Sequence, residues 1–204
     1  MVVFTLSAAQ AQKVNPADYF SIEELKAAQT ADEHNSLSEV EKQTIAVMNL
    51  ARLYPKKFAR EYLPAVVEKS ERLKPGAAYE ELIEELLSHK PGSPLLPDDF
   101  LYKHARTHAK DMGTSAKSGH NSSGGKTFIM RMAPMEKRYQ GVAENCQYGF
   151  KDAAEIVVDL LIDKGVPSRG HRKNILDPLF NRVGVSFEPH KKFEFNSVHI
   201  FAAE

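Results

Sequence analysis

Apolar residues recur at helical spacing through the first two thirds of the chain. Residues 38–41 read Ser-Glu-Val-Glu, a capping box in which a serine begins a helix and the third helical residue is an acid. The helix behind this box is expected to bury one apolar stripe and to end near Pro55, where proline interrupts the pattern. The same reasoning predicts further helices over Pro55–Tyr62, Tyr79–Ser88, Phe100 to about Thr114, and Ala153–Ile162.

The last third of the chain contains the strand signals. Three short segments are rich in Val, Ile, Phe and Tyr, namely Gly141–Tyr148, Arg182–Phe187 and Phe193–Ala202. Helices come first and strands later, without βαβ alternation, which favours an α+β domain with a central antiparallel sheet. The most apolar segment, Ala153–Ile162, is assigned to a central helix, although its β-branched residues would also suit a strand.

Two regions lack these patterns. Residues 12–37 are polar and contain turn-like material, so we interpret residues 1–37 as an N-terminal arm and residues 38–204 as the folded domain. Residues 64–77 are expected to form a connection, because Pro64 and the pair Pro75-Gly76 interrupt them.

The first residues resemble the end of a signal peptide. Val2–Leu6 is apolar, and Ala9-Gln10-Ala11 has the small-x-small form of a signal-peptidase site, although a basic region is missing and the apolar stretch is short. We therefore expect a signal-peptide remnant and an extracytoplasmic protein, secreted or periplasmic. An ordinary chain terminus is the alternative.

The charge, the cysteine content and the length of the apolar runs limit what the chain can bind and where it can lie. The chain has 204 residues with 27 basic and 27 acidic side chains, so its formal net charge is zero and no global field attracts nucleic acid or anionic lipid. The single cysteine, Cys146, excludes an internal disulfide and a cysteine-rich zinc ribbon. No apolar run approaches the length of a membrane-spanning helix, so a soluble chain without a transmembrane segment is expected.

The loop over residues 118–127, SGHNSSGGKT, looks at first like a nucleotide-binding loop because it ends in Gly-Lys-Thr. A Walker A motif needs a glycine where this chain has His120, and Gly119 comes one residue too early. The motif should also follow a buried strand, whereas this loop follows a predicted helix. His120, rather than Lys126, is therefore the residue of interest.

Some titratable residues have helical spacing. His104 and His108 share one face of a predicted helix, but Ala105 stands where a zinc-protease helix would carry its glutamate. Local packing is the preferred interpretation of this pair, and a metal pair is the alternative.

Three acids follow the same spacing on the central helix, namely Glu155, Asp159 and Asp163. Like charges four residues apart repel by roughly 0.2–0.5 kcal/mol per pair. Spacing alone favours a solvated stripe. The functional alternative is that Asp163 points into a cleft with cationic or metal partners.

Three short segments each contain a candidate site residue, and each is a weak signal of function when taken alone. SGHN carries His120, GVAENCQYG carries Glu144, and SRGHRKNIL carries His171. Together they offer two imidazoles and one or two carboxylates, which can form a zinc-type nitrogen–oxygen site or an acid–base group.

In the order of these segments, the sequence resembles members of the CAP superfamily, which comprises cysteine-rich secretory, antigen 5 and pathogenesis-related proteins. The resemblance rests on LYKHARTHAKDM at 101–112, SGH at 118–120, AEN at 143–145, GHRKNIL at 170–176 and VGV at 183–185, and it covers roughly residues 38–204. It implies a three-layer α-β-α sandwich, the CAP (SCP-like) fold, in agreement with the α+β interpretation.

The resemblance also implies a central cleft in which a His, Glu, Glu, His tetrad binds a divalent metal, often zinc. Carried over motif by motif, the tetrad becomes His120, Glu144, Asp163 and His171. Asp163 stands where the family usually has glutamate in Trp-x-x-Glu, so its carboxylate is one methylene shorter and could miss the metal. The chain lacks the motif tryptophan and the disulfides of the eukaryotic members, and in this respect it resembles the bacterial SCP-like branch.

Fold alone does not define the function. The leading hypothesis is an exported bacterial CAP-domain protein whose cleft binds a divalent metal, zinc being one candidate, and through it a ligand. A second hypothesis is a metal-dependent hydrolase with Glu144 or Asp163 as general base. A third is a lipid-, sterol- or partner-binding module with a structural tetrad. The ligand stays open among small molecules, lipids and peptides.

Overall fold

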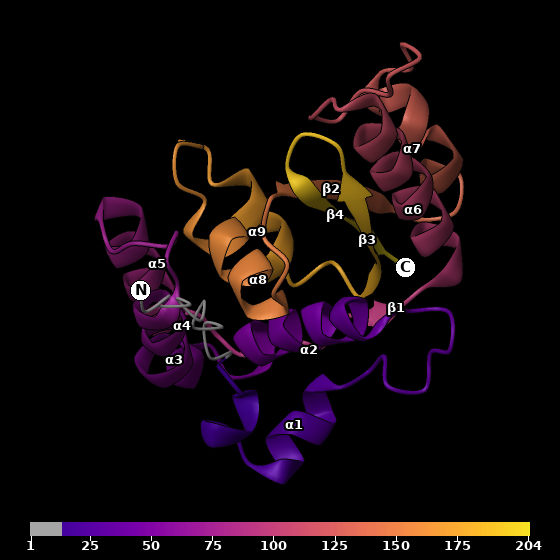
Figure 1. The fold of residues 1–204 in the computed structure, drawn as a ribbon. Coiled ribbons are helices and arrows are strands. Elements are labelled where there is room, and N and C mark those ends of the chain that lie inside the picture. The colour runs from indigo at the N-terminus through magenta and orange to yellow at the C-terminus, as the bar shows by residue number, and fades with distance from the viewer. Residues whose placement is uncertain (1–13) are drawn as a thin grey trace, which may run out of the picture.

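The computed structural model describes residues 14–204, which form a helical first half followed by a sheet with helices on both faces (Figure 1). In chain order the elements are η1 (Pro16–Asp18), α1 (Ile22–Ala28), α2 (Glu39–Leu53), α3 (Pro55–Lys57), the π-helical turn η2 (Phe58–Tyr62), α4 (Leu63–Lys69), α5 (Ala77–Ser88), β1 (Leu96–Pro97), α6 (Asp99–Ser115), α7 (Phe128–Glu136), β2 (Gly141–Tyr148), α8 (Ala153–Ile162), α9 (Gly170–Leu176), β3 (Arg182–His190) and β4 (Glu194–Ala203).

The sheet has the strand order β1-β3-β4-β2. β4 pairs antiparallel with both β3 and β2, while the two-residue β1 pairs parallel with β3. Helices α6 and α7 pack on one face of this sheet, and α2, α8 and α9 pack on the other (Figure 1). The predicted α+β class and three-layer α-β-α architecture are confirmed. The short parallel strand β1 makes the sheet mixed, whereas a purely antiparallel sheet was expected.

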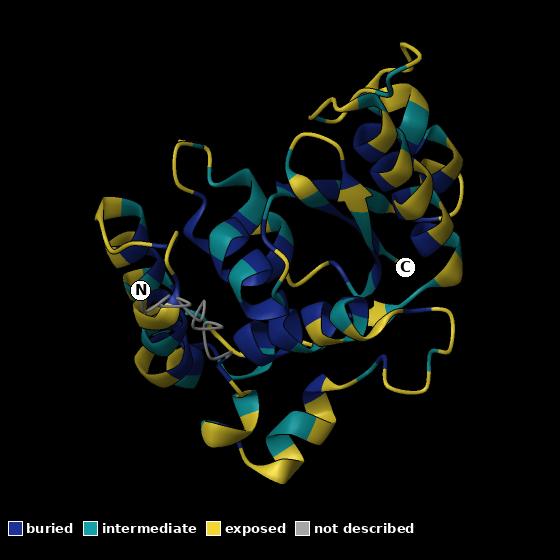
Figure 2. Ribbon diagram, in the orientation of Figure 1, coloured by how far each residue is buried: buried dark blue, intermediate teal, exposed yellow. Residues whose placement is uncertain are grey.

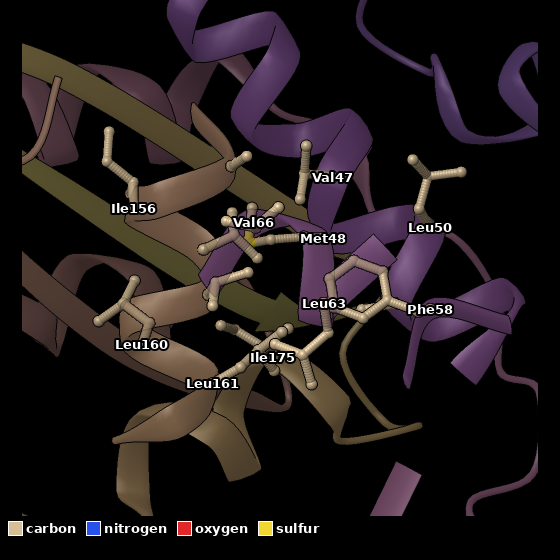
Figure 3. Packing of buried hydrophobic residues seen from close by; sticks show 14 of the residues in the cluster. Val47, Met48, Leu50, Phe58, Leu63, Val66, Ile156, Leu160, Leu161 and Ile175 are labelled. Atoms are coloured by element: carbon tan, nitrogen blue, oxygen red, sulfur yellow. The ribbon is translucent and has the colours of Figure 1, made fainter. Parts of the chain in front are cut away.

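The larger core lies between the sheet and the helices α2, α4 and α8. Val47 and Met48 of α2 lie among Ile156 and Leu161 of α8 and Val66 of α4 (Figure 3). Each of these side chains is buried, and full burial of one such side chain stabilises the fold by about 1.5–3 kcal/mol. The inner faces of α2 and α8 are accordingly the most continuously buried helical surfaces (Figure 2).

Helix α6 approaches β3 closely because glycine occupies the contact. A Cβ atom on Gly184 of β3 would lie 2.2 Å from the backbone nitrogen of Tyr102 and 2.3 Å from the carbonyl carbon of Leu101. Near the other end of α6, a Cβ on Gly113 would lie 2.1 Å from the Pro189 carbonyl oxygen. These glycines therefore set the distance between the helix and the sheet.

Two fully buried arginines connect the helices on the other face. The Arg52 guanidinium donates to four backbone carbonyl oxygens, those of Ser93, Ile175, Asp177 and Phe180, at 2.7–2.8 Å. Burial lowers the pKa of Arg52 to about 10, with Asp177 opposing that shift. The side chain thus remains charged at neutral pH and holds together loops that are distant in sequence.

The second arginine, Arg172, begins in α9 and reaches α5. Its guanidinium donates to the carbonyl oxygens of Leu161, Ile162 and Ala78 and forms ion pairs with Glu81 and Glu85. Because α9 carries His171 beside it, this network also fixes one of the candidate site residues.

Several predicted element boundaries are confirmed. The capping box at Ser38 is present, with its backbone N–H donating to Glu41 at 2.7 Å, and α2 ends at Leu53. The segments 141–148 and 153–162 match β2 and α8 residue for residue. Asp98 caps α6 by accepting the N–H groups of Phe100 and Leu101.

The expected connection over residues 64–77 is wrong in its first part. The helix continues through η2 into α4, and Pro64 lies in the first turn of α4. The π-helical turn directly before it, in which the Leu63 N–H donates to the Phe58 carbonyl oxygen, marks the irregular point at which the chain accepts a proline. The polar stretch before residue 37 likewise contains a capped helix, α1, which packs on α2 and buries Ala28.

The assignment of residues 1–37 as a separate arm remains a prediction. The signal-peptide interpretation concerns residues 1–13 and lies outside the described part of the chain. Among residues 14–204, helices long and apolar enough to cross a lipid bilayer are absent.

Candidate functional site

The loop between α6 and α7 positions His120. The chain leaves α6 through Ala116, a left-handed residue with φ 58°, and turns again at Gly119, where φ is 105°. The Gly119 N–H donates to the Tyr148 hydroxyl at 2.9 Å, and its carbonyl oxygen accepts from His108 Nε2 at 2.8 Å. The loop is therefore attached to β2 and α6 immediately before His120.

His120 and Glu144 form the first pair of predicted site residues. His120 Nδ1 lies 3.0 Å from Glu144 Oε1, and the glutamate side chain is fully buried while 43 % of the histidine side chain is exposed. Arg131 of α7 binds the same carboxylate at both oxygens, with Nη1 2.8 Å from Oε1 and Nη2 2.5 Å from Oε2. Arg131 Nη1 also donates to the His120 carbonyl oxygen at 2.5 Å.

These contacts determine the charge of Glu144. Burial by itself would raise the pKa of this carboxyl, but the hydrogen bonds from Arg131 and His120, together with the Arg131 and His108 charges, hold it below the usual value. Glu144 is therefore an anion whose oxygens are already occupied. A carboxylate in this state orients a histidine better than it accepts a proton.

His171 and Asp163 form the second pair. Asp163 is the C-cap of α8, with a left-handed φ of 53°, and its buried carboxylate turns toward the first turn of α9. Asp163 Oδ1 accepts from His171 Nδ1 at 2.7 Å, and Oδ2 accepts from the His171 backbone N–H at 2.9 Å. One carboxylate thus holds both the ring and the backbone of the same histidine.

The expectation of a solvated acidic stripe along α8 is wrong. Asp163 is buried and bound to His171, and Asp159 accepts from Gln147 Nε2 at 3.2 Å. Burial raises the pKa of Asp159, with Gln147 and the charges of Arg72 and His171 opposing the shift. Glu155 accepts from the Ser70 hydroxyl at 2.5 Å. All three acids have specific partners because this face of α8 lies against β2 and α4 rather than water.

Strand β2 separates the two pairs. Successive side chains of a strand point to opposite faces, so Glu144 faces α6 and α7 while its neighbour Asn145 faces α9. Asn145 Nδ2 donates to the His171 carbonyl oxygen at 3.0 Å, and Asn174 Nδ2 donates to Asn145 Oδ1 at 2.8 Å. Within residues 14–204, β4 is the only strand paired with β2, so the other edge of β2 lies between the two pairs.

The four predicted residues are therefore brought together as two pairs. Among residues 14–204, hydrogen bonds or ion pairs joining His120 or Glu144 to Asp163 or His171 are absent. Convergence of all four on one ion stays a prediction.

The two pairs share one chemical feature. In each, a buried carboxylate accepts from histidine Nδ1, and hydrogen bonds from the described residues to the Nε2 atoms of His120 and His171 are absent. A carboxylate at Nδ1 selects the tautomer whose Nε2 carries the free lone pair. Both imidazoles are thereby prepared to bind a metal or to accept a proton.

The two histidines of α6, His104 and His108, lie in different surroundings. The half-buried His104 packs against the Phe100 ring, with 4.7 Å between ring centroids, which confirms local packing for this residue. His108 is buried instead, and burial lowers its pKa, with the Glu144 charge opposing that shift. Its Nε2 lies 4.0 Å from Glu144 Oε1, which places His108 beside the first pair.

Three residues next to Glu144 were not assigned to the site from the sequence, namely Arg131, His108 and Cys146. Cys146 follows Glu144 by two residues, so the alternation of a strand places both on one face, and that signal was readable. Its thiol is buried, and burial raises its pKa. Nothing in the sequence distinguishes Arg131 from an exposed arginine. Only the packing of α7 on β2 brings it to Glu144.

The chain was compared with known proteins. It is 35% identical over 116 residues to an uncharacterized protein, YkwD, of Bacillus subtilis (strain 168), a match that covers 54% of this chain and 43% of the relative. The chain thus spans less than half the length of that relative.

The solved structures to which the chain is similar are more distant in sequence. One is an extracellular protein containing a SCP domain from Bacillus anthracis, 24% identical, with a TM-score of 0.43 over 55% of this chain and 35% of that chain. Another is venom allergen-like protein 4 of Schistosoma mansoni, 12% identical, with a TM-score of 0.47 over 82% of this chain and 90% of that chain.

The family model for CAP, the cysteine-rich secretory protein family, matches residues 46–202. This range contains β1–β4 and helices α6–α9, with both carboxylate–histidine pairs. The chain therefore belongs to the CAP family of cysteine-rich secretory proteins.

Proposed function

We propose that the chain binds a divalent metal, zinc in the first instance, through Nε2 of His120 and Nε2 of His171. The observation that supports this most is the common arrangement of the two histidines. Each is held at Nδ1 by a buried carboxylate, and no hydrogen bond from residues 14–204 reaches its Nε2. This carboxylate–histidine arrangement is the usual support of a zinc-binding imidazole.

The residues present fit such a metal in the chemistry of their donors. Neutral imidazole nitrogen suits zinc, and both rings are partly exposed, with 43 % and 23 % of the His120 and His171 side chains accessible. His120 and His171 would hold the ion. Glu144 and Asp163 would orient the two rings, because their oxygens are already engaged by Arg131, His120 and the His171 backbone.

Two protein ligands would leave coordination positions for a ligand molecule. A bound zinc ion supplies a Lewis acid to which an anionic or carbonyl group of a small molecule or peptide can bind. Binding of such a ligand is the proposed role of the site. The secretory character of the family and the signal-like residues before position 12 support an exported protein.

Zinc titration of the metal-free protein by calorimetry tests the proposal. His120→Ala and His171→Ala should each weaken zinc binding at the cleft by ten-fold or more, and the double variant should abolish binding at the cleft. His34→Ala is the matched control, because His34 lies 3.8 Å from Asp99 at the start of α6, whose 17 residues place it about 25 Å from the loop of His120. Equal zinc affinity in wild type and in the double variant would refute the proposal.

Hydrolysis is a second candidate, favoured by one observation. The pair Asp163–His171 combines a buried carboxylate with a partly exposed imidazole, the arrangement of a general base. His171 rather than Glu144 or Asp163 would accept the proton. Zinc-dependent turnover of a chromogenic ester, lost in His171→Ala and unchanged in His34→Ala, would support hydrolysis, and equal turnover by the two variants would refute it.

A further inference from the structure

A second group of metal-ligating atoms lies on the α6 side of β2. His108, Glu144 and Cys146 are all buried, and one ligand atom from each lies within 4.8 Å of the others. Within residues 14–204 this is the only such group of three or more His, Cys, Asp or Glu side chains. His108 and Cys146 have no part in the proposed cleft site.

The secondary structure brings these atoms together. Glu144 and Cys146 are two residues apart on β2 and therefore point to the same face of the sheet. His108 comes from α6, which packs on that face. Cys146 belongs to an apolar cluster that includes Ala105 and Met132, and all three side chains are buried, so water has little access to them.

The separations agree with those around a single zinc ion. Cys146 Sγ lies 3.6 Å from Glu144 Oε1, and His108 Nε2 lies 4.0 Å from the same oxygen. Tetrahedral angles and ordinary Zn–N, Zn–O and Zn–S bond lengths place neighbouring ligand atoms about 3.4–3.6 Å apart. The sulfur–oxygen separation already has this value, and the nitrogen–oxygen separation exceeds it by about half an ångström, so a small movement of the His108 ring would bring Nε2 to bonding distance from an ion held at Oε1 and Sγ.

The polar groups of this cluster are incompletely satisfied by the protein. His108 Nδ1 is buried without a hydrogen-bond partner. The Cys146 thiol has only long contacts, at 3.6 Å to Glu144 Oε1, 3.7 Å to His120 Nδ1 and 3.8 Å to the Gly119 carbonyl oxygen. Buried polar groups are normally paired, and the Cys146 sulfur in particular would gain a strong partner in a metal ion.

We infer that His108 Nε2, Glu144 Oε1 and Cys146 Sγ form a buried structural zinc site inside the domain, with three protein ligands. A thiolate, an imidazole and a carboxylate are zinc ligands, and the burial of all three side chains leaves little room for a substrate. The inference goes beyond the proposed function and does not depend on it, because the two sets of ligands share no residue; Glu144 orients His120 in the cleft and would bind the ion here.

Zinc binding at this site changes the protonation of two of its ligands. The Cys146 thiol loses its proton to solvent, and its sulfur forms a bond to zinc as thiolate. The neutral His108 ring moves its proton from Nε2 to Nδ1, and Nε2 binds zinc in place of donating to the Gly119 carbonyl oxygen. One proton is released per zinc ion, and the two anionic ligands neutralise the charge of the ion.

Arg131 competes with zinc for Glu144. Its Nη1 and His120 Nδ1 both lie within hydrogen-bond distance of Oε1, so a zinc ion at Oε1 must displace Nη1 while Nη2 can remain on Oε2. Replacement of this arginine by glutamine removes the competing cation. Zinc should therefore bind Arg131→Gln more tightly than wild type and raise its melting temperature by more.

Cobalt titration of the metal-free full chain tests the site. Co²⁺ replaces Zn²⁺ in tetrahedral sites, and a thiolate ligand adds a charge-transfer band that can arise only from Cys146, the single cysteine. We expect this band in wild type and in His171→Ala. It should be lost in Cys146→Ser and His108→Gln, with at least ten-fold weaker Zn²⁺ binding in both. Circular dichroism and Cys146→Ala separate ligand loss from misfolding.

The outcomes separate the two metal proposals. A charge-transfer band that depends on Cys146 and His108 but not on His171 supports the structural site. Metal binding without a thiolate band, lost in His171→Ala and retained in Cys146→Ser, overturns the structural site and leaves the cleft site standing. Absence of metal binding in wild type overturns both.

Discussion

Asp163 holds His171 at two points, with Oδ1 2.7 Å from the ring Nδ1 and Oδ2 2.9 Å from the backbone nitrogen. The contact is possible because the chain reverses between α8 and α9, and Asp163 accepts a left-handed conformation to cap α8. A longer side chain is unnecessary at this distance. Aspartate therefore reaches this histidine and supports its ring.

The first prediction concerns that contact. Asp163→Asn keeps the left-handed backbone, which asparagine tolerates, but it can present an N–H to His171 Nδ1. The ring should then carry its proton on Nε2, which removes the metal-binding lone pair. We expect zinc affinity at the cleft to fall by about 10–100-fold, with a small change in melting temperature. Calorimetry and thermal unfolding measure the two effects.

Asp177→Asn is the matched control for that variant. Asp177 follows α9, and its side-chain Oδ1 accepts from the Leu179 N–H, which asparagine can reproduce. Unchanged zinc affinity in Asp163→Asn would show that Asp163 does not support a metal ligand.

The second prediction concerns the contact between α6 and β3. Gly184→Ala places a Cβ within 2.3 Å of two backbone atoms in the first turn of α6, and the backbone of a packed helix cannot move aside locally. We expect a loss of about 3 kcal/mol or more in the free energy of unfolding. Gly124→Ala, where no atom lies within 4 Å of the added Cβ, should be nearly neutral. Urea unfolding measures the stability of both variants, and equal stability of Gly184→Ala and Gly124→Ala would contradict the prediction.

The third prediction concerns Arg52. Lysine cannot reach four carbonyl oxygens with one ammonium group, so Arg52→Lys leaves buried acceptors unpaired. We expect destabilisation of about 3 kcal/mol by chemical denaturation. Arg60→Lys, on the exposed side of η2, provides the control and should change stability by less than about 0.5 kcal/mol. A comparable loss in both variants would point to a general effect of the substitution.

The fourth prediction concerns pH. His199 is buried on β4, and burial, with a smaller contribution from the His171 charge, lowers its pKa to about 3. The unfolded value is about 6.5, so between these two pH values the unfolded chain binds the proton and the folded chain does not. Stability from this group is therefore complete above about pH 6.5 and falls as pH decreases toward about 3, by up to about 1.4 kcal/mol per pH unit.

The variant His199→Gln tests this dependence. Glutamine can keep a hydrogen bond with the Ser197 hydroxyl, which lies 2.8 Å from His199 Nε2, but it does not titrate. The slope of unfolding free energy against pH between 4 and 6 should decrease by close to one proton in His199→Gln and stay unchanged in His34→Gln. An unchanged slope in both would contradict the buried neutral histidine.

Local patterns in the sequence predicted much of the fold. The capping box at Ser38 and the apolar run 153–162 determine their helices through contacts within a few residues, and the strand 141–148 follows from its own composition. The ordered motifs around His120, Glu144 and His171 also predicted the family. These features are local, so propensity and periodicity are sufficient to read them.

Partners distant in sequence could be assigned only from the tertiary structure. The acids of α8 have a spacing that suits a solvated stripe, yet packing against β2 and α9 buries Asp163 and gives it His171 as a partner. Arg131 reaches Glu144 because α7 lies on β2, and His108 meets Cys146 because Gly184 lets α6 approach the sheet. The sequence by itself thus determined the elements and the candidate histidines. The packing of helices on both faces of one sheet decided which charges are paired, which are buried and which nitrogen atoms remain free.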